Sequence, residues 1–301
     1  WSATNAPFER RYQRVSFPSL EPLQSVTIES TSEAAPLKAT AAYAANDELI
    51  VIGQPAYHRH HLWHLKTNQL VRLETETSLT GVRVSPDGRH ALVASAWGPQ
   101  VLFDARTGVA GPRLDIGRGS STMSMVEQWL PDGGRLVTAS ALAAVYAWDL
   151  DARTVRPLVP EDAIAPAIGV PNLEVSPDGE LLAIVLPNGT LELWSVDELV
   201  RLRTLRRGTW ECKGDYGVPH GLAFSPDGRW LLTAFADGSA WMHAVPRGTP
   251  SYEVAERRFS ADDTATFVAG WGDFSPDGKL FFTTSHGLDF TSDATETNVF
   301  E

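Results

Sequence analysis

Four of the eight histidines crowd into one short stretch, a pattern that raises the question of metal binding. They are His58, His60, His61 and His64. On a strand, His60 and His64 would share one face about 13 Å apart, which is too far for one ion. His58 and His60 are closer, but no carboxylate or cysteine stands beside them and the spacing fits no standard zinc pattern. We therefore expect no metal site and interpret these residues as solvated loop histidines.

Motifs that would supply a catalytic nucleophile, a phosphate cradle or a catalytic metal are missing from the sequence. There is no Gly-x-Ser-x-Gly elbow, no Gly-x-x-x-x-Gly-Lys-Ser/Thr loop and no His-Glu-x-x-His pair. Residues 117–121 are rich in glycine and serine but do not follow the strand-to-helix pattern of a phosphate loop. We expect no enzyme activity and no cofactor. An active site built from scattered acids and histidines would leave no such motif, so that alternative stays open.

A repeated tetrapeptide decides which elements carry these residues. Ser-Pro-Asp-Gly begins at residues 85, 176, 225 and 275, and the variant Leu-Pro-Asp-Gly begins at residue 130. A fixed period of about 45 to 50 residues indicates a repeat architecture. Proline presets the first corner of a type I turn, aspartate tolerates the second, and glycine takes the positive φ that follows. Each motif therefore predicts a tight antiparallel hairpin.

The flanks of each motif predict short strands. Apolar residues alternate before the turn, as at Val82 and Val84, and a second apolar strand follows it, as at 91–93. A third strand ends in an aromatic residue, as at Trp63 and Trp148, and a fourth completes the unit. Four short strands in each repeat are typical of a β-propeller blade. We count six such units, beginning near residues 39, 80, 125, 170, 219 and 266.

These units resemble the repeats of the WD40 family and its bacterial relatives, over residues 39–301. The dipeptide that names the family survives once, as Trp148-Asp149. Many family repeats carry an Asp-His-Ser/Thr-Trp hydrogen-bond network. The fifth unit keeps the polar part of this network but lacks the tryptophan, whereas the fourth keeps only Trp194. The resemblance implies an all-β propeller of four-stranded antiparallel blades, with stability that rests mainly on packing between sheets.

Residues 1–38 lie outside the six units but contain two strand-like stretches, at 13–17 and 23–29. One interpretation makes them the end of a preceding blade in a seven-bladed propeller, which we favour. In the other, residues 23–29 supply the missing outer strand of the last blade and close a six-bladed ring, which removes exposed edges. We expect residues 1–38 and 39–301 to form one domain overall, and the chain to be a fragment of a longer protein.

The amino-acid composition argues against some classes of binding partner. The formal net charge is −12, which argues against a general nucleic-acid binder and against docking on anionic membranes. No apolar run approaches the ~20 residues of a membrane span. The single Cys212 excludes an internal disulfide framework, so a reducing, cytoplasmic location is the default expectation.

The lengths of the connections point to a binding surface. The turns between the first and second, and between the third and fourth, strands of each unit are short, whereas the links between units are long. Loops on a rigid scaffold are where binding usually resides. We call the end of the sheets where these long links lie the long-loop face. Large side chains of the types that often dominate binding energy are expected there, and they are the predicted partner-binding residues Trp97, Arg118, Trp210, Tyr216 and Trp271. The alternative is that these aromatics pack beneath their own loops.

A second constellation comes from aligning the first strands. The residue two before the turn motif is polar in four units, namely Arg83, Gln128, Glu174 and Asp273. In a propeller these positions lie near the central axis. A water-filled channel would satisfy them, and a small polar ligand at the axis is the other interpretation.

Three functions are compatible with these sequence features. We favour a non-catalytic platform for protein partners, using the long-loop face of a WD40-like propeller. The alternative is a regulatory or sensor module within a larger protein that also carries a kinase, NTPase or protease domain. The third is a propeller hydrolase or lactonase that would use Glu174 and Asp273. Which partner binds is not encoded in any one motif.

Overall fold

The computed structural model describes residues 8–15, 19, 21–30, 40–43, 49–54, 59–74, 79–95, 100–114, 124–140, 143–160, 170–206, 219–235, 239–245, 256–260, 267–287 and 295–300. The chain divides into two compact units, residues 1–123 and residues 124–301, which we call unit 1 and unit 2. The predicted division at residue 38 and the single-domain organisation stay predictions. Each unit is described by itself.

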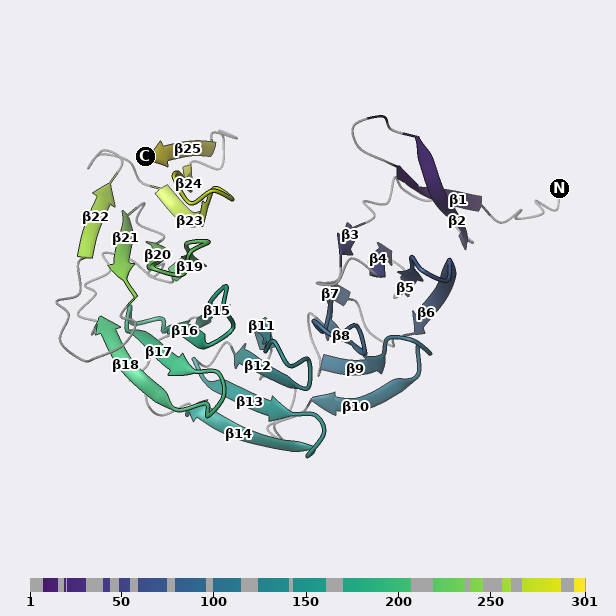
Figure 1. Cartoon of the computed structure of the whole chain (residues 1–301), viewed down its shortest axis with the longest axis horizontal. Coiled ribbons are helices and arrows are strands. Elements are labelled where there is room, and N and C mark those ends of the chain that lie inside the picture. Colours follow the sequence, from purple (N-terminus) through teal and green to yellow (C-terminus); the bar gives the residue numbers. More distant parts are fainter. Residues whose placement is uncertain are drawn as a thin grey trace. The chain divides into compact units, whose positions relative to one another are not determined.

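Unit 1 contains one two-stranded and two four-stranded antiparallel sheets (Figure 1). The two-stranded sheet pairs β1 (Phe8–Val15) with β2 (Pro22–Ser30). The next sheet has the order β3 (Thr40–Tyr43), β4 (Leu49–Gln54), β5 (Arg59–His64), β6 (Gln69–Glu74). The third has the order β7 (Leu79–Val84), β8 (His90–Ser95), β9 (Gln100–Asp104), β10 (Ala110–Leu114).

Unit 2 contains three four-stranded sheets and a three-stranded sheet. The first runs β11 (Ser124–Trp129), β12 (Arg135–Ser140), β13 (Val145–Asp149), β14 (Thr154–Val159). The second runs β15 (Asn172–Val175), β16 (Leu181–Val185), β17 (Leu191–Ser195), β18 (Arg201–Arg206). The third runs β19 (Pro219–Phe224), β20 (Trp230–Phe235), β21 (Ser239–Ala244), β22 (Glu256–Ser260). The last runs β23 (Phe267–Phe274), β24 (Phe281–Gly287), β25 (Thr295–Phe300).

The predicted repeats are confirmed. Their first strands begin at Thr40, Leu79, Ser124, Asn172, Pro219 and Phe267, each within two residues of the position expected from the sequence. Consecutive strands pair in antiparallel order within each sheet, as hairpin closure by the tetrapeptide requires. The degenerate turn of the first repeat, residues 45–47, lies outside the described residues.

The turn motif forms the hairpin that its sequence predicts. In each copy the glycine has positive φ, from 65° at Gly228 to 77° at Gly179. Its N–H donates to the carbonyl of the residue three before it, for example Gly88 to Ser85 at 2.9 Å. A side chain at Gly179 would also collide with Pro131 of the preceding repeat's turn, because a Cβ there would lie 2.8 Å from the proline ring. Glycine is therefore required at this position for two reasons, namely the positive φ of the backbone and the close approach of the proline ring.

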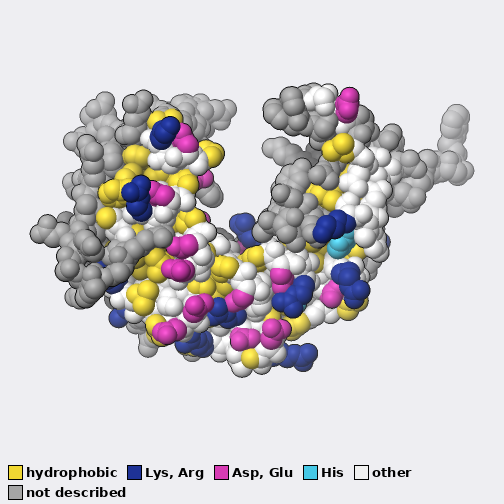
Figure 2. Space-filling model, in the orientation of Figure 1, with side chains coloured by type: hydrophobic (Ala, Val, Ile, Leu, Met, Phe, Trp, Pro, Cys, Tyr) yellow, Lys and Arg dark blue, Asp and Glu magenta, His cyan; other side chains and the backbone are white. Residues whose placement is uncertain are grey.

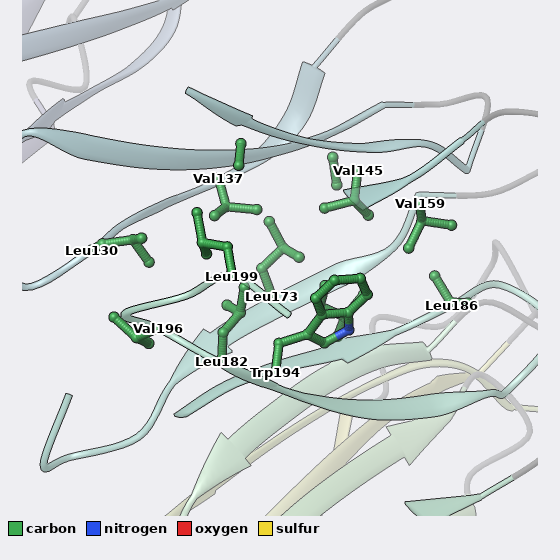
Figure 3. Close-up of a cluster of buried hydrophobic side chains, with 13 residues drawn as sticks. Leu130, Val137, Val145, Val159, Leu173, Leu182, Leu186, Trp194, Val196 and Leu199 are labelled. Atoms are coloured by element: carbon green, nitrogen blue, oxygen red, sulfur yellow. The ribbon is translucent and has the colours of Figure 1, made fainter. Parts of the chain in front are cut away.

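The core of unit 2 lies between neighbouring sheets. Since paired residues on adjacent strands share a face, each sheet presents one apolar set to the preceding sheet and another to the following sheet. Between the β11–β14 and β15–β18 sheets, Val137 and Val145 meet Leu182 and Trp194 (Figure 3). The opposite face of the β15–β18 sheet, with Ala183 and Leu193, packs against Leu222 and Leu231 of the next sheet. The middle strands β16 and β17 are thus buried on both faces.

Unit 1 repeats this arrangement. One face of the β3–β6 sheet, with Leu62 and Leu73, packs against Ala91 and Phe103 of the β7–β10 sheet. The other face carries Ile50, Ile52 and Trp63, and Val26 of β2 packs against it. The amide of Gln24 also donates to the carbonyl of Leu65 at 2.6 Å. The strand pair β1–β2 therefore covers the face of the first repeat that points away from the second.

Candidate functional site

The tetrapeptide turns of the sheets are closed by their own hydrogen bonds. The Ser225 hydroxyl donates to Asp227 at 2.6 Å and accepts from the Trp230 N–H at 2.9 Å. The backbone N–H and the side chain of Arg229 donate to the same carboxylate. These bonds, with that from Ser225 first, lower the pKa of Asp227 to about 2. The copies at Ser85 and Ser275 repeat the pattern, so this chemistry maintains the turn and leaves little capacity for a ligand.

Two arginines tie neighbouring sheets of unit 2 together at this end. The Arg135 guanidinium pairs with Asp132 of its own turn and donates to the carbonyls of Val196 and Asp197 at 3.0 and 2.9 Å. Arg156 donates to the carbonyls of Glu198 and Leu199 at 2.9 and 3.1 Å. The carbonyl oxygens of the turn at 195–200 therefore accept hydrogen bonds from arginines of the preceding sheet. These contacts are structural.

The tryptophans of the third strands do not share one hydrogen-bond network. The indole of Trp148 donates to Thr138 at 3.0 Å, which is a threonine–tryptophan bond of the kind that the family network contains. Trp194 instead donates at 3.0 Å to Glu192, a carboxylate only 4 % exposed. Arg201 neutralises that carboxylate at 2.7 Å from the outer strand β18. Sequence reasoning missed Glu192, although a glutamate two residues before the aromatic position, among leucines, was the available signal.

The fifth repeat retains a fragment of the family network. The Thr233 hydroxyl lies 3.3 Å from Nε2 of His243, which is completely buried in the place of the usual tryptophan. The side chain of His220 and the whole of Asp237 lie outside the described part of the chain.

The interpretation of the clustered histidines as solvated is wrong for two of them. His60 and His61 lie on β5 and are 3 % and 7 % exposed. Both faces of β5 are covered, one by the β7–β10 sheet and the other by β2, so neither face meets solvent. His64 is half-buried, with Nε2 2.9 Å from the Ala105 carbonyl of the next repeat. His58 lies outside the described residues.

Within the residues that the structure describes, no group of three or more His, Cys, Asp or Glu side chains is arranged to hold a metal ion. Over the same residues, no helix is long and apolar enough to cross a bilayer. Acidic and basic side chains are intermingled on the described surface of the visible face (Figure 2).

The polar residues predicted at the axis hold one register position. Each lies opposite the residue seven positions after the first residue of the turn motif, in the pairs Arg83–Leu92, Gln128–Val137, Glu174–Ala183 and Asp273–Phe282. In unit 2 the first strands β11, β15, β19 and β23 lie next to one another in succession (Figure 1). The sequence alignment of the repeats was therefore correct in register.

The environments of these four residues differ. Gln128 and Glu174 are half-buried, whereas Arg83 and Asp273 are exposed. The Asp273 carboxylate accepts the N–H of Phe274 at 2.7 Å, and the Gln128 amide lies 3.4 Å from the Trp129 carbonyl. No hydrogen bond described for these residues joins one of them to another, so their convergence on a ligand stays a prediction.

Most of the predicted partner-binding residues fall where the structure gives no description. Trp97, Arg118, Trp210 and Tyr216 lie outside the described residues. Trp271 lies on β23, with its backbone opposite Thr284 of β24, but its side chain is not described. The strand bounds do place the expected long links, for example between Arg206 of β18 and Pro219 of β19.

The sequence and the fold both have known counterparts. Residues 208–243 match the family model described as WD domain, G-beta repeat. Apoptotic protease-activating factor 1 of Rattus norvegicus is 28% identical over 165 residues, which are 52% of this chain and 12% of that protein. The Danio rerio protein of the same name is 23% identical over 196 residues, 62% of this chain and 15% of the relative. This chain thus matches only a small part of either relative.

The solved β-propeller domain of Myceliophteria thermophila Cps50 (Swd1) superposes with a TM-score of 0.61. The superposition covers 96% of this chain and 90% of that domain, at 11% identity, so the likeness concerns the fold alone. A special likeness to bacterial members of the family stays a prediction. The tandem four-stranded sheets and the propeller counterpart show that the chain has a β-propeller fold, and its residues 208–243 match a WD40 repeat.

Proposed function

We propose that this protein is a non-catalytic scaffold that binds a protein partner through the long-loop end of its sheets. WD40 propellers generally mediate protein–protein interactions, and the chain has that fold. The observation that carries the proposal is the asymmetry between the two ends of the sheets. At one end the tetrapeptide turns close on themselves through Ser–Asp–Arg hydrogen bonds, and at the other long links join consecutive sheets. The expectation that all turns at the first end are short is wrong for the fifth repeat, where residues 245–255 join β21 to β22.

The residues proposed to contact the partner are those predicted from the sequence. Trp210 and Tyr216 belong to the link between β18 and β19, and their side chains combine large apolar area with a polar group, as binding hot spots usually do. Trp97, Arg118 and Trp271 extend the proposed surface. We also propose a cytoplasmic location and a protein partner in preference to nucleic acid or membrane, supported by the net charge of −12 and the single Cys212.

The test compares two ends of the same molecule. Tagged protein is used to capture partners from a native extract, and the bound proteins are quantified for the wild type, the Trp210→Ala/Tyr216→Ala variant and a control. The control is Val109→Ser, because Val109 is 64% exposed beside a short turn. We expect the double variant to capture at least tenfold less partner than the wild type. Val109→Ser should capture as much as the wild type. Equal capture by all three would contradict the assignment of the surface.

A second candidate is a regulatory or sensor module of a longer protein. It is supported by the two apoptotic protease-activating factors, each of which is far longer than the segment it shares with this chain. Reading the complete open reading frame tests it directly. A kinase, NTPase or protease domain in the same frame would support this role, and a frame that encodes only propeller repeats would contradict it.

A further inference from the structure

One register position in the third strands differs systematically between the two units. The third strands of the four-stranded sheets align at a large ring, which is Trp63, Phe103, Trp148, Trp194 or His243. Three residues before this ring stand His60, Gln100, Val145, Leu191 and Ala240, and none is more than 3% exposed. The position is therefore polar in both four-stranded sheets of unit 1 and apolar in the three four-stranded sheets of unit 2, at the same depth, whereas the three-stranded last sheet has Thr297 there.

His60 is the most exceptional of these residues. Both of its ring nitrogens are buried and have no hydrogen-bond partner among the described residues. Buried polar groups normally find a partner, so an orphaned imidazole calls for an explanation. Burying the neutral ring costs only the hydrogen bonds that the ring loses with water. A charged form would be far more costly unless a counter-ion were close.

Among the described side chains, no such counter-ion is present on the face that His60 occupies. His60 lies opposite Leu73 of β6 and Gly53 of β4, which places it on the face that packs against the β7–β10 sheet. The buried side chains on that face are apolar, namely Leu49, Val51, Leu62, Val71, Leu73, Val82, Val84, Ala91, Val93, Val101 and Phe103. The charged group described there is Arg113 of β10, whose backbone lies opposite Val101, and His64 lies farther along the same strand as His60.

We propose that His60 is an acid-sensitive lock: its protonation opens the β3–β6 sheet of unit 1, while the β15–β18 sheet of unit 2, whose sequence contains no histidine, remains closed under the same conditions. The lock needs no specific ligand, because the proton itself disfavours the buried state. The apolar residues at the matched positions, Val145, Leu191 and Ala240, have nothing to titrate.

The direction of the pH dependence follows from burial. Desolvation lowers the pKa of His60 from 6.5 to about 4. Between these values the opened chain binds more protons than the closed one, so stability rises with pH. The stabilising contribution is complete above pH 6.5 and is lost as the pH falls toward 4. At pH 5 this linkage shifts the opening equilibrium by about 30-fold relative to pH 7.5.

Hydrogen–deuterium exchange of the whole chain at pH 7.5 and 5.0, corrected for the intrinsic exchange rate, tests the proposal. Protection of the β4–β6 amides of the wild type should fall about 30-fold between these pH values, and that of the β16–β17 amides should stay constant. In His60→Leu the pH-dependent loss at β4–β6 should disappear. The matched control His90→Gln, at a half-buried histidine of β8, should keep the wild-type response.

An equal loss of β4–β6 protection in the wild type and in His60→Leu would overturn the proposal. If His60→Leu does not fold, the ring of His60 is titrated by NMR in the wild-type protein instead. A ring that stays neutral down to pH 5 supports the lock, and a midpoint near 6.5 overturns it.

Discussion

Leu232 of β20 and Phe282 of β24 hold the same register position in neighbouring sheets of unit 2, but their environments are opposite. Leu232 lies opposite Ala223 and is completely buried, and it belongs to a cluster with Ala240 and Phe281. Phe282 lies opposite Asp273 and is 37% exposed. The larger side chain is therefore the one that meets solvent.

This contrast shows that a repeat position is core or surface according to what packs on it. The face of β24 that includes Phe281 meets the preceding sheet and is buried, whereas the face that includes Phe282 and the neighbouring Leu280 is exposed. Burial of apolar area, which is the main stabilising contribution in such a stack, thus differs between two sheets of nearly the same local sequence pattern.

The largest expected effect is the difference between two truncations at this position. Leu232→Ala should lower the free energy of unfolding by about 3 kcal/mol, because it removes buried methyl groups and leaves a cavity. Phe282→Ala should cost about 1 kcal/mol, because much of the ring is already in contact with water. Urea denaturation of both variants measures the difference. Equal costs would mean that the outer face of β24 is covered in solution.

A substitution on the face of the β23–β25 sheet that meets the preceding sheet tests how closely the two sheets pack. A Cβ at Gly272 would lie 3.0 Å from Cδ2 of Leu232 and 3.3 Å from the Phe282 carbonyl oxygen. Gly272→Ala should therefore destabilise by about 1–2 kcal/mol through overpacking. Gly134→Ala is the matched control, because a Cβ there would meet Asp151 only at 3.4 Å. Thermal unfolding of the pair should show a lower Tm for Gly272→Ala alone.

The arginine contacts between sheets should matter more than those within a turn. Arg135→Ala removes two bonds to the next sheet, and we expect a loss of about 1–2 kcal/mol. The side chain of Arg229 is 74% exposed and pairs with Asp227 of its own turn, so Arg229→Ala should cost less than about 0.5 kcal/mol. Denaturant midpoints of the two variants measure this. A reversed order would show that the turn ion pairs, not the contacts across sheets, stabilise this end.

The smallest difference is expected between equivalent turns of the two compared sheets. The Ser225 and Ser275 hydroxyls make the same pair of bonds, to Asp227 and the Trp230 N–H, and to Asp277 and the Leu280 N–H. Because these bonds are local, Ser225→Ala and Ser275→Ala should each cost about 1 kcal/mol. Clearly unequal costs would mean that the turns depend on the neighbouring sheet.

The same turn predicts an acid response. Hydrogen bonds, led by that from Ser225, hold the pKa of Asp227 near 2, below the ordinary 3.8. A lowered carboxyl pKa contributes stability that is present above pH 3.8 and lost as the pH falls toward 2. The Ser225→Ala variant should therefore lose less stability than the wild type between pH 4 and 2. Denaturation at a series of pH values in this range checks the slope.

Local features of the sequence were sufficient to predict the repeats. Proline and glycine restrict the backbone of their own residues, so the hairpins at Ser85, Ser176, Ser225 and Ser275 could be placed before any contact between sheets was known. The strands followed from the alternation that flanks each turn. The candidate site was less accessible, because the register of Glu174 and Asp273 could be aligned but their exposure could not.

The sequence by itself determined the all-β class, the hairpin positions and the shared register of the repeats, because these depend on residues close together in the chain. Only the tertiary structure decided that His60 and His61 are buried, that Glu192 binds Trp194 and Arg201, and that Phe282 is exposed. Each of these depends on which sheet covers which face. The sequence of a strand with two apolar faces does not show whether each face is covered by another sheet or exposed to water.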